Sequence, residues 1–240
     1  MENKHELKPK IVLGIAAHPD DLDFAASGSF ATWSSQGVDV YYLLLTDGSK
    51  GSADPDMTSE KLIEIREAEQ KKAAEIVGAK GAFFLRHPDG MLEVTMDLKK
   101  EICSYIRKLK PDVIVTMDPS VLYSDKYNYI NHPDHRAAGQ ATLDSVFPLS
   151  RDRLSFPELF EQGLLPHKVK TLLLTNFDKQ NFYVDITENF DKKVSALAAH
   201  ASQIDDVEGV KGFMAQWATA AGGRIGVKYA EGFLRLDISD

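Results

Sequence analysis

Three copies of the tripeptide His-Pro-Asp carry histidine and aspartate side chains from which a reactive site could be built in this 240-residue chain. They stand within AHPDD at residues 17–21, RHPDG at 86–90 and NHPDH at 131–135. Imidazole nitrogens and carboxylate oxygens are ligands for hard or borderline divalent metals. The same side chains move protons in general acid–base catalysis. The three copies therefore raise the hypothesis of one metal-dependent site assembled from distant segments.

The first and third copies each have the form of a helix start. Proline is favoured at the first helical position, because its missing N–H would have no partner there. With Pro19 in that position, the helix cap is His18. The same construction makes His132 the cap before Pro133. A capped helix start accounts for the aspartates of the first turn, whose charges meet the positive end of the helix dipole, but histidine is not among the preferred caps.

The spacing of the charged residues favours a metal site over simple capping. Residues three apart on a helix share a face, so His18 and Asp21 are expected to point at one spot. His132 and His135 have the same spacing. Catalytic zinc uses three protein ligands and keeps one position for water or substrate. Three of these four side chains would suffice, which leaves one histidine and Asp20 for proton transfer.

The middle copy differs from the other two. Gly90 stands three residues after His87, so RHPDG is not expected to form a third metal half-site. Motifs of other site chemistries are missing from the sequence, including G-x-G-x-x-G, the Walker sequence, G-x-S-x-G and H-E-x-x-H. The outer copies are therefore the strongest chemical signal in the chain.

Short apolar runs that alternate with segments of helical period must position these residues. Strands are expected at 10–17, 38–46, 82–86, 112–117, 171–176 and, with a weaker pattern, 182–187. Helices are expected at 21–35, 58–77, 95–109, 134–146 and 188–203. Apolar runs without alternation are typical of central strands covered on both faces. The order predicts an α/β fold of Rossmann-like layout, a three-layer sandwich around a mostly parallel central sheet.

Such a sheet would gather the unusual loops at one edge. Ligands bind beyond the carboxyl ends of the strands in folds of this kind. The segments AHPDD, TDGSKGS, RHPDG and MDPS follow the first four expected strands in turn. A single domain is expected over 1–240. The segment 148–168, with three prolines and no expected strand, is interpreted as an insertion or a lid.

The composition and charge of the chain limit the classes of binding partner and the cellular compartment that are expected. Apolar residues make up 43% of the chain, charged residues 27%, and the formal charge is −8 with a sequence pI of about 5.4. This balance predicts a soluble globular protein with no nucleic-acid or anionic-membrane partner. The single cysteine, Cys103, cannot form an internal disulfide and is expected to be buried. Because MENKHELKPK at the start has no apolar signal region, a cytoplasmic protein is expected.

AHPDD after the first strand, with NHPDH later, resembles the LmbE-like, or PIG-L, family of zinc-dependent de-N-acetylases. The likeness extends to IREAEQKKAAEIVG, HPDG, VDIT and KVSALAAHASQ, and so covers most of residues 10–205, with AEGFLRL near the end. It implies the LmbE-like fold and a hydrolase that removes acetyl from an N-acetylated sugar or sugar conjugate of N-acetylglucosamine type. Acetate and a free amine would be the products. Family members are often oligomeric, so a homo-oligomer is among the expectations.

The resemblance also implies a role for each matched residue. It implies Zn²⁺, or another divalent metal, held by three ligands: His18, Asp21 and His135. Asp20 would be the general base, and His132 would stabilise the oxyanion or deliver a proton. Asp134, as the partner of His132, would raise the pKa of that imidazole and hold its orientation. Arg66 and Asp89 would contact substrate hydroxyls, although Arg66 in a Glu-rich helix also fits a solvated surface charge.

The chain departs from the family pattern near both outer motifs. Asp23 stands where many relatives carry the longer glutamate, so its supporting hydrogen bonds are expected to differ. Ile130 stands where some members place a mobile tyrosine, and its neighbours Tyr127 and Tyr129 leave a tyrosine contribution to the oxyanion site open. His200 occupies a family-typical position to which the sequence assigns no role.

Two other functions fit the same residues. One is a metal-dependent amidase or carbamoyl hydrolase that acts on a non-sugar metabolite, which would differ only in its pocket contacts. The other is a non-catalytic sugar-binding member of the fold. Asp20 and His132 argue against the second, since binding alone requires no base beside a water molecule.

Overall fold

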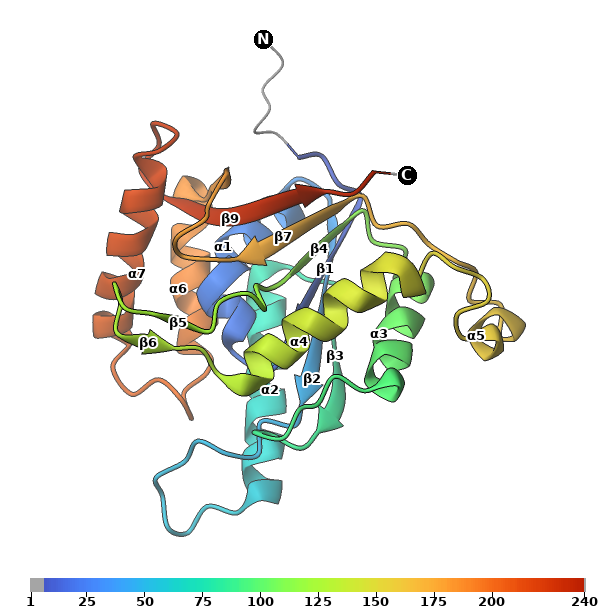
Figure 1. Ribbon diagram of the computed structural model, residues 1–240. Coiled ribbons are helices and arrows are strands. Elements are labelled where there is room, and N and C mark those ends of the chain that lie inside the picture. Colours follow the sequence, from blue (N-terminus) through green and yellow to red (C-terminus); the bar gives the residue numbers. More distant parts are fainter. Residues whose placement is uncertain (1–6, 240) are drawn as a thin grey trace.

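The computed structural model describes residues 7–239 (Figure 1), so residues 1–6 of the N-terminal stretch considered above lie outside it. The strands are β1 (Ile11–Ala16), β2 (Asp39–Thr46), β3 (Gly81–His87), β4 (Val113–Met117), β5 (Tyr123–Ser124), β6 (Tyr129–Ile130), β7 (Thr171–Thr175), β8 (Phe182–Asp185) and β9 (Ala230–Asp237). The helices are α1 (Asp21–Ser35), α2 (Ser59–Val77), α3 (Met96–Leu109), α4 (Pro133–Asp144), α5 (Pro157–Glu161), α6 (Phe190–Ala198) and α7 (Val207–Gly222). Within this part of the chain, no helix has the length and apolar character needed to cross a membrane.

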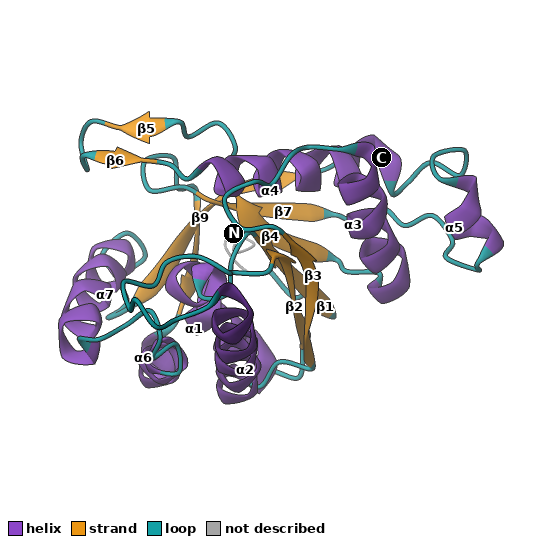
Figure 2. Ribbon diagram, turned by 90° about the horizontal axis from the view of Figure 1, so that it is seen from below, coloured by secondary structure: helices purple, strands orange, loops and turns teal. Residues whose placement is uncertain are grey.

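A seven-stranded sheet forms the middle layer, in the order β3-β2-β1-β4-β7-β9-β8. Its first five strands pair in parallel, and β9 runs antiparallel to both β7 and β8. Figure 2 shows α3 and α4 on one face of the sheet and α1, α2, α6 and α7 on the other. The predicted α/β sandwich with a mostly parallel sheet is confirmed.

The side chains of β1 explain why the strand runs are apolar throughout. Val12 and Ala16 enter the core cluster under α1 and α2, whereas Leu13 and Ile15 enter the cluster under α3 and α4. Both faces of the strand are therefore buried, as parallel sheets require. Gly14 lets α1 approach closely, since a Cβ there would lie 2.7 Å from the Phe30 ring.

Helices α2 and α3 begin and end within one residue of the predicted positions, and capping residues explain these ends. The side chain of Thr58 accepts a hydrogen bond from Lys61 N–H at the start of α2, and Gly78 ends that helix in the left-handed conformation at φ 78°. Thr95 caps α3 in the same way. Cys103 on α3 is buried, as expected, and burial raises the pKa of its thiol to about 11.

Five of these strands and helices were not predicted from the sequence: β5, β6, β9, α5 and α7. The β5–β6 hairpin has two residues in each strand, too few to give a pattern. Strand β9, AEGFLRLD, lies near one edge of the sheet and mixes charged with apolar residues. Helix α7 contains Gly209 and Gly212, which lower helix propensity. The expected helix 188–203 is shorter in the structure, since α6 ends at Ala198.

The segment 148–168 packs at the end of the sheet opposite to the carboxyl ends of the parallel strands. Nη2 of the buried Arg107 donates hydrogen bonds of 2.8–2.9 Å to carbonyl oxygens of residues 149, 152 and 155. His167 lies 2.8 Å from the carbonyl oxygen of Pro111, which precedes β4. Figure 1 shows α5, within this segment, on the side away from the β5–β6 hairpin. We infer an insertion rather than a lid.

Replacing Arg107 by methionine is expected to lower the free energy of unfolding by about 2–4 kcal/mol, because partly buried carbonyl groups would lose a charged donor. Urea denaturation of the purified variant measures this change. Lys108→Met is the matched control, since Lys108 is exposed and its loss should cost less than about 1 kcal/mol. Equal stabilities of the two variants would contradict the anchoring role of Arg107.

Candidate functional site

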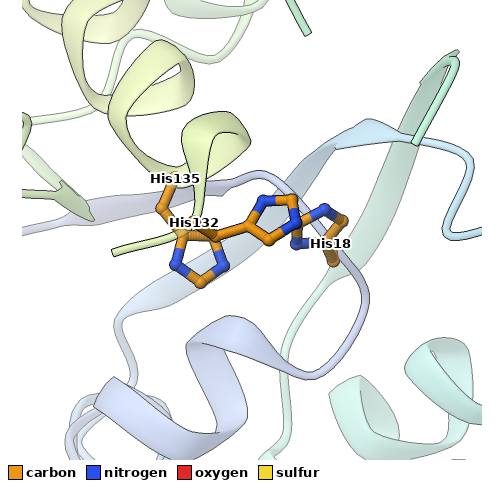
Figure 3. A group of neighbouring side chains, drawn as sticks. All are labelled: His18, His132 and His135. Atoms are coloured by element: carbon orange, nitrogen blue, oxygen red, sulfur yellow. The ribbon is translucent and has the colours of Figure 1, made fainter. Parts of the chain in front are cut away.

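Three histidines from two distant segments meet at the carboxyl end of β1 (Figure 3). His18 lies in the loop between β1 and α1, and His132 and His135 lie at the start of α4. The ring centroid of His18 is 4.8 Å from that of His132 and 5.3 Å from that of His135. The order β2-β1-β4 places the site where the strand order reverses, the usual binding crevice of such sheets.

Asp21 links two of these histidines. Its Oδ1 lies 3.0 Å from Nε2 of His135, and its Oδ2 lies 3.4 Å from Nδ1 of His18. The pKa of Asp21 is held well below its usual range, because these two imidazoles outweigh the effect of burial. The three residues matched to metal ligands therefore lie side by side, with one carboxylate between two imidazoles.

A second set of ligand atoms surrounds the other nitrogen of His18. Nε2 of His18 lies 3.1 Å from Oδ1 of Asp89 and 3.3 Å from Oδ2 of Asp134. All three side chains are buried, and their ligand atoms lie close enough together to hold a metal ion, as do those of His18, His132 and His135. The sequence prediction excluded a metal half-site in RHPDG, because that motif has no second ligand one helix turn after His87. The structure instead brings Asp89 to the first motif across the sheet edge.

The charges around His18 fit a bound cation. Burial opposes a charge on this imidazole, but hydrogen bonds to Asp21 and Asp89, and the charges of those carboxylates, raise its pKa to about 10. A proton on His18 thus balances buried carboxylates in the metal-free protein. A divalent cation bound by imidazole and carboxylate would supply the same positive charge. The donor set therefore fits a divalent metal.

Metal binding near pH 7 is expected to release about one proton, because a ligating imidazole must be neutral and His18 is protonated below its pKa of about 10. Apparent affinity should therefore fall as the pH is lowered. Calorimetric titration of Zn²⁺ in buffers of different ionisation enthalpy measures the proton count. Heats that do not depend on the buffer would contradict the protonated state of His18.

Helix α1 has the bounds expected from the sequence, 21–35, but its cap differs from the one considered for the first motif. The helix begins at Asp21 with Asp20 as its cap, so the prediction that His18 caps a helix beginning at Pro19 is wrong. His18 and Asp21 meet through a turn, in which Oδ2 of Asp21 accepts a hydrogen bond of 2.8 Å from the His18 backbone N–H. The cap of α4 is His132, as predicted, with proline at the first helical position.

The relation between His132 and Asp134 also differs from the prediction. The Asp134 carboxylate accepts hydrogen bonds from the backbone N–H groups of Gly90 and Leu92 and faces His18 instead. The pKa of His132 is lowered, chiefly by burial and by the charge of His18; the charge of Asp134 raises it, as expected, but does not outweigh these two effects. Nδ1 of His132 accepts the Asp134 backbone N–H at 3.2 Å. In the neutral ring the proton is therefore on Nε2.

Arg66 is buried against the first motif, which excludes the interpretation as a solvated charge; only 4% of its surface is exposed. Its Nη2 donates to Oδ2 of Asp20 at 3.3 Å and to the carbonyl oxygen of Pro19 at 2.8 Å. Burial and the charge of Asp21 raise the pKa of Asp20 to about 7, although Arg66 acts in the opposite direction.

The contact between Asn131 and His135 was not predicted from the sequence. Oδ1 of Asn131 lies 3.2 Å from Nδ1 of His135 and accepts a hydrogen bond of 2.9 Å from the Tyr129 hydroxyl. A proton on Nδ1 of His135 leaves Nε2 as its ligand atom. Tyr127 packs instead against Trp217, with ring centroids 5.1 Å apart. Tyr129 is therefore the tyrosine closer to the histidines, and the only sequence signal for Asn131 is its place directly before the second motif.

Comparisons with known proteins agree on one family. Its sequence profile, described as PIG-L, GlcNAc-PI de-N-acetylase, matches residues 13–146. A diacetylchitobiose deacetylase of Thermococcus kodakarensis is 35% identical over 225 residues, which cover 93% of this chain and 82% of that protein. A Bacillus anthracis protein named probable N-acetyl-alpha-D-glucosaminyl L-malate deacetylase 2 is 29% identical and covers 80% of each chain.

A solved structure gives the same result. The N,N'-diacetylchitobiose deacetylase from Pyrococcus horikoshii, determined with an inhibitor, superposes with a TM-score of 0.87 and is 31% identical. The superposition covers 95% of this chain and 84% of that one. The likeness therefore extends over nearly the whole chain.

Proposed function

The chain belongs to the PIG-L family of GlcNAc-PI de-N-acetylases, and from this membership we propose that it hydrolyses the N-acetyl group of an N-acetylated sugar or sugar conjugate. Water and the acetamide would give acetate and a free amino sugar. The observation that carries the proposal is the Asp21 carboxylate between the imidazoles of His18 and His135, with Asp20 directly before it as the cap of α1. The T. kodakarensis and B. anthracis relatives are both named as deacetylases, which does not favour an amidase on non-sugar metabolites or a non-catalytic protein.

We propose that His18, Asp21 and His135 would hold the metal. Support comes from the Asp21 carboxylate between the two imidazoles and from Asn131, which leaves Nε2 of His135 available. Zinc suits a set of two imidazoles and one carboxylate. When bound, such a cation would lower the pKa of water and polarise a carbonyl oxygen.

Asp20 is proposed as the general base. Its pKa of about 7 lets it accept a proton from the attacking water and return it to the departing amine. Arg66 donates to the Asp20 carboxylate and to the carbonyl oxygen before it, so it holds the base in place. Because Arg66 makes these hydrogen bonds, we propose that its role is to position Asp20 rather than to contact the substrate directly. Asp89 stays a proposed contact for sugar hydroxyls.

His132 is proposed to stabilise the oxyanion. With Nδ1 occupied by a backbone N–H, the neutral ring presents Nε2–H as a donor. A donor placed where negative charge develops lowers the barrier by about 3 kcal/mol. Asp134 fixes the turn of residues 90–92 and faces His18, so its proposed contribution is to hold the site together rather than to charge His132.

Acetate release tests the proposed function. The substrates are N-acetylglucosamine and N,N'-diacetylchitobiose. N-acetylated amino acids, assayed for acetate, and carbamoyl compounds, assayed for ammonia, are the comparisons, each with and without a chelator. We expect acetate from the sugars only, loss of activity with chelator, and its return with Zn²⁺. Turnover of the non-sugar compounds alone would contradict the sugar assignment, and the absence of any turnover would contradict the enzyme assignment.

A further inference from the structure

The backbone of Asp20 has an unusual conformation for a residue with a side chain. Its φ is 92°, in the region that L-residues other than glycine rarely adopt. Such a conformation persists only where the surrounding structure holds it, and it is often found at functional sites. Asp20 also caps α1 with no hydrogen bond from its own side chain to the helix. Groups from elsewhere in the fold must therefore hold this turn.

Gln70 of α2 supplies one of these groups. Its Oε1 accepts a hydrogen bond of 3.0 Å from the Asp20 backbone N–H, and its Nε2 donates one of 2.8 Å to Oδ2 of Asp23. The chemistry of the partners fixes the amide orientation, because an N–H requires an acceptor and a carboxylate requires a donor. Methionine could make neither bond, and glutamate would place a second carboxylate against Asp23.

Asp23 is itself held by two further buried side chains. Its Oδ1 accepts a hydrogen bond of 3.0 Å from the Tyr42 hydroxyl, and its Oδ2 lies 2.9 Å from Nε2 of His200. Gln70, Asp23 and His200 have no exposed surface. They come from α2, α1 and the turn after α6, so the network ties three distant parts of the chain to one turn. Both ends of the buried Gln70 amide are hydrogen-bonded within this network, which restricts the amide to one arrangement.

We propose that Gln70 is a positioning residue for hydrolysis, which holds the backbone of Asp20 so that its carboxylate stays at the metal site. The proposal rests on the proposed function, in which Asp20 is the general base. It gives Asp23 and His200 a common role, namely to fix the amide of Gln70. Gln70 has no contact with the metal ligands among the hydrogen bonds described, so it acts through Asp20.

The variants Gln70→Met and Gln70→Glu test this role. Because a shift of about 1 Å in a reacting group can cost about 100-fold in rate, we expect kcat to fall about 10- to 100-fold. KM should change less than about threefold and the bound metal should stay at the wild-type ratio, since neither depends on Asp20. Gln216→Met is the matched control, because Gln216 is an exposed helical glutamine. It should leave kcat unchanged.

A double variant separates positioning from general damage to the fold. If Gln70 acts through Asp20, adding Gln70→Met to Asp20→Asn should cause no further loss of the residual rate. A crystal structure of Gln70→Met should show φ of residue 20 outside the positive region.

Three results would overturn the proposal: an unchanged kcat, a loss of metal that accompanies the loss of rate, or a full further loss in the Asp20→Asn background. Wild-type protein that releases no acetate would instead contradict the proposed function. The two failures are therefore distinguishable.

Discussion

Asp20→Asn is expected to lower kcat for deacetylation by about 10²–10⁴-fold, the usual contribution of a positioned general base. Asparagine has nearly the same shape and can still meet Arg66, but it cannot take a proton from water. Since Asp20 is not among the proposed ligands, the variant should bind metal at the wild-type ratio. Acetate release and elemental analysis of the same preparation measure both quantities.

The control for this variant is Asp39→Asn, at the start of β2 and outside the site. It should keep wild-type activity. An Asp20→Asn protein that retains more than about a tenth of the wild-type kcat would show that another group accepts the proton. Loss of metal together with activity would place Asp20 among the ligands instead.

His135→Ala is expected to weaken Zn²⁺ binding by more than about 100-fold, because loss of a direct ligand should exceed the 10- to 100-fold effect of losing a hydrogen-bond partner of a ligand. Asn131→Ala removes such a partner, since Asn131 lies 3.2 Å from Nδ1 of His135, and should fall within that smaller range. Competition with a chromogenic chelator gives both affinities.

The test of His135 as a ligand is whether His135→Ala weakens Zn²⁺ binding more than Asn131→Ala does. His167→Ala serves as the histidine-to-alanine control, because His167 contacts the Pro111 carbonyl at the other end of the sheet. Its affinity for Zn²⁺ should equal that of the wild type. A His135→Ala protein that binds Zn²⁺ as tightly as Asn131→Ala would show that His135 is not a ligand and would favour the group of His18, Asp89 and Asp134.

The fold was predictable where both faces of an element are buried. Strands β1, β2, β4 and β7 consist mostly of apolar residues without alternation, and each was predicted within two residues of its ends. Strand β9 was missed because residues such as Glu231 and Arg235 interrupt its apolar pattern. Glu231 is nevertheless buried, since Lys193 pairs with it at 2.6 Å. Such pairing depends on the tertiary fold and leaves no local pattern.

The residues that meet in the site were predictable from their types and from their positions in the loops. The sequence indicated that His18 and His135 would lie at one edge of the sheet, and the structure places them there. The direction of each carboxylate was not predictable. Asp134 faces His18 rather than His132, because backbone N–H groups of residues 90 and 92 take its oxygens. The role of Gln70 depends on the positive φ of Asp20, which no sequence pattern indicates.

Anomalous X-ray diffraction at the zinc edge, on crystals of the zinc-loaded protein, tests the central claim most directly. We predict one strong peak about 2.0–2.2 Å from a nitrogen of His18, an oxygen of Asp21 and a nitrogen of His135. A peak bound by Asp89 and Asp134, or no peak among these side chains, would contradict the assignment of one catalytic metal held by the first and third His-Pro-Asp motifs.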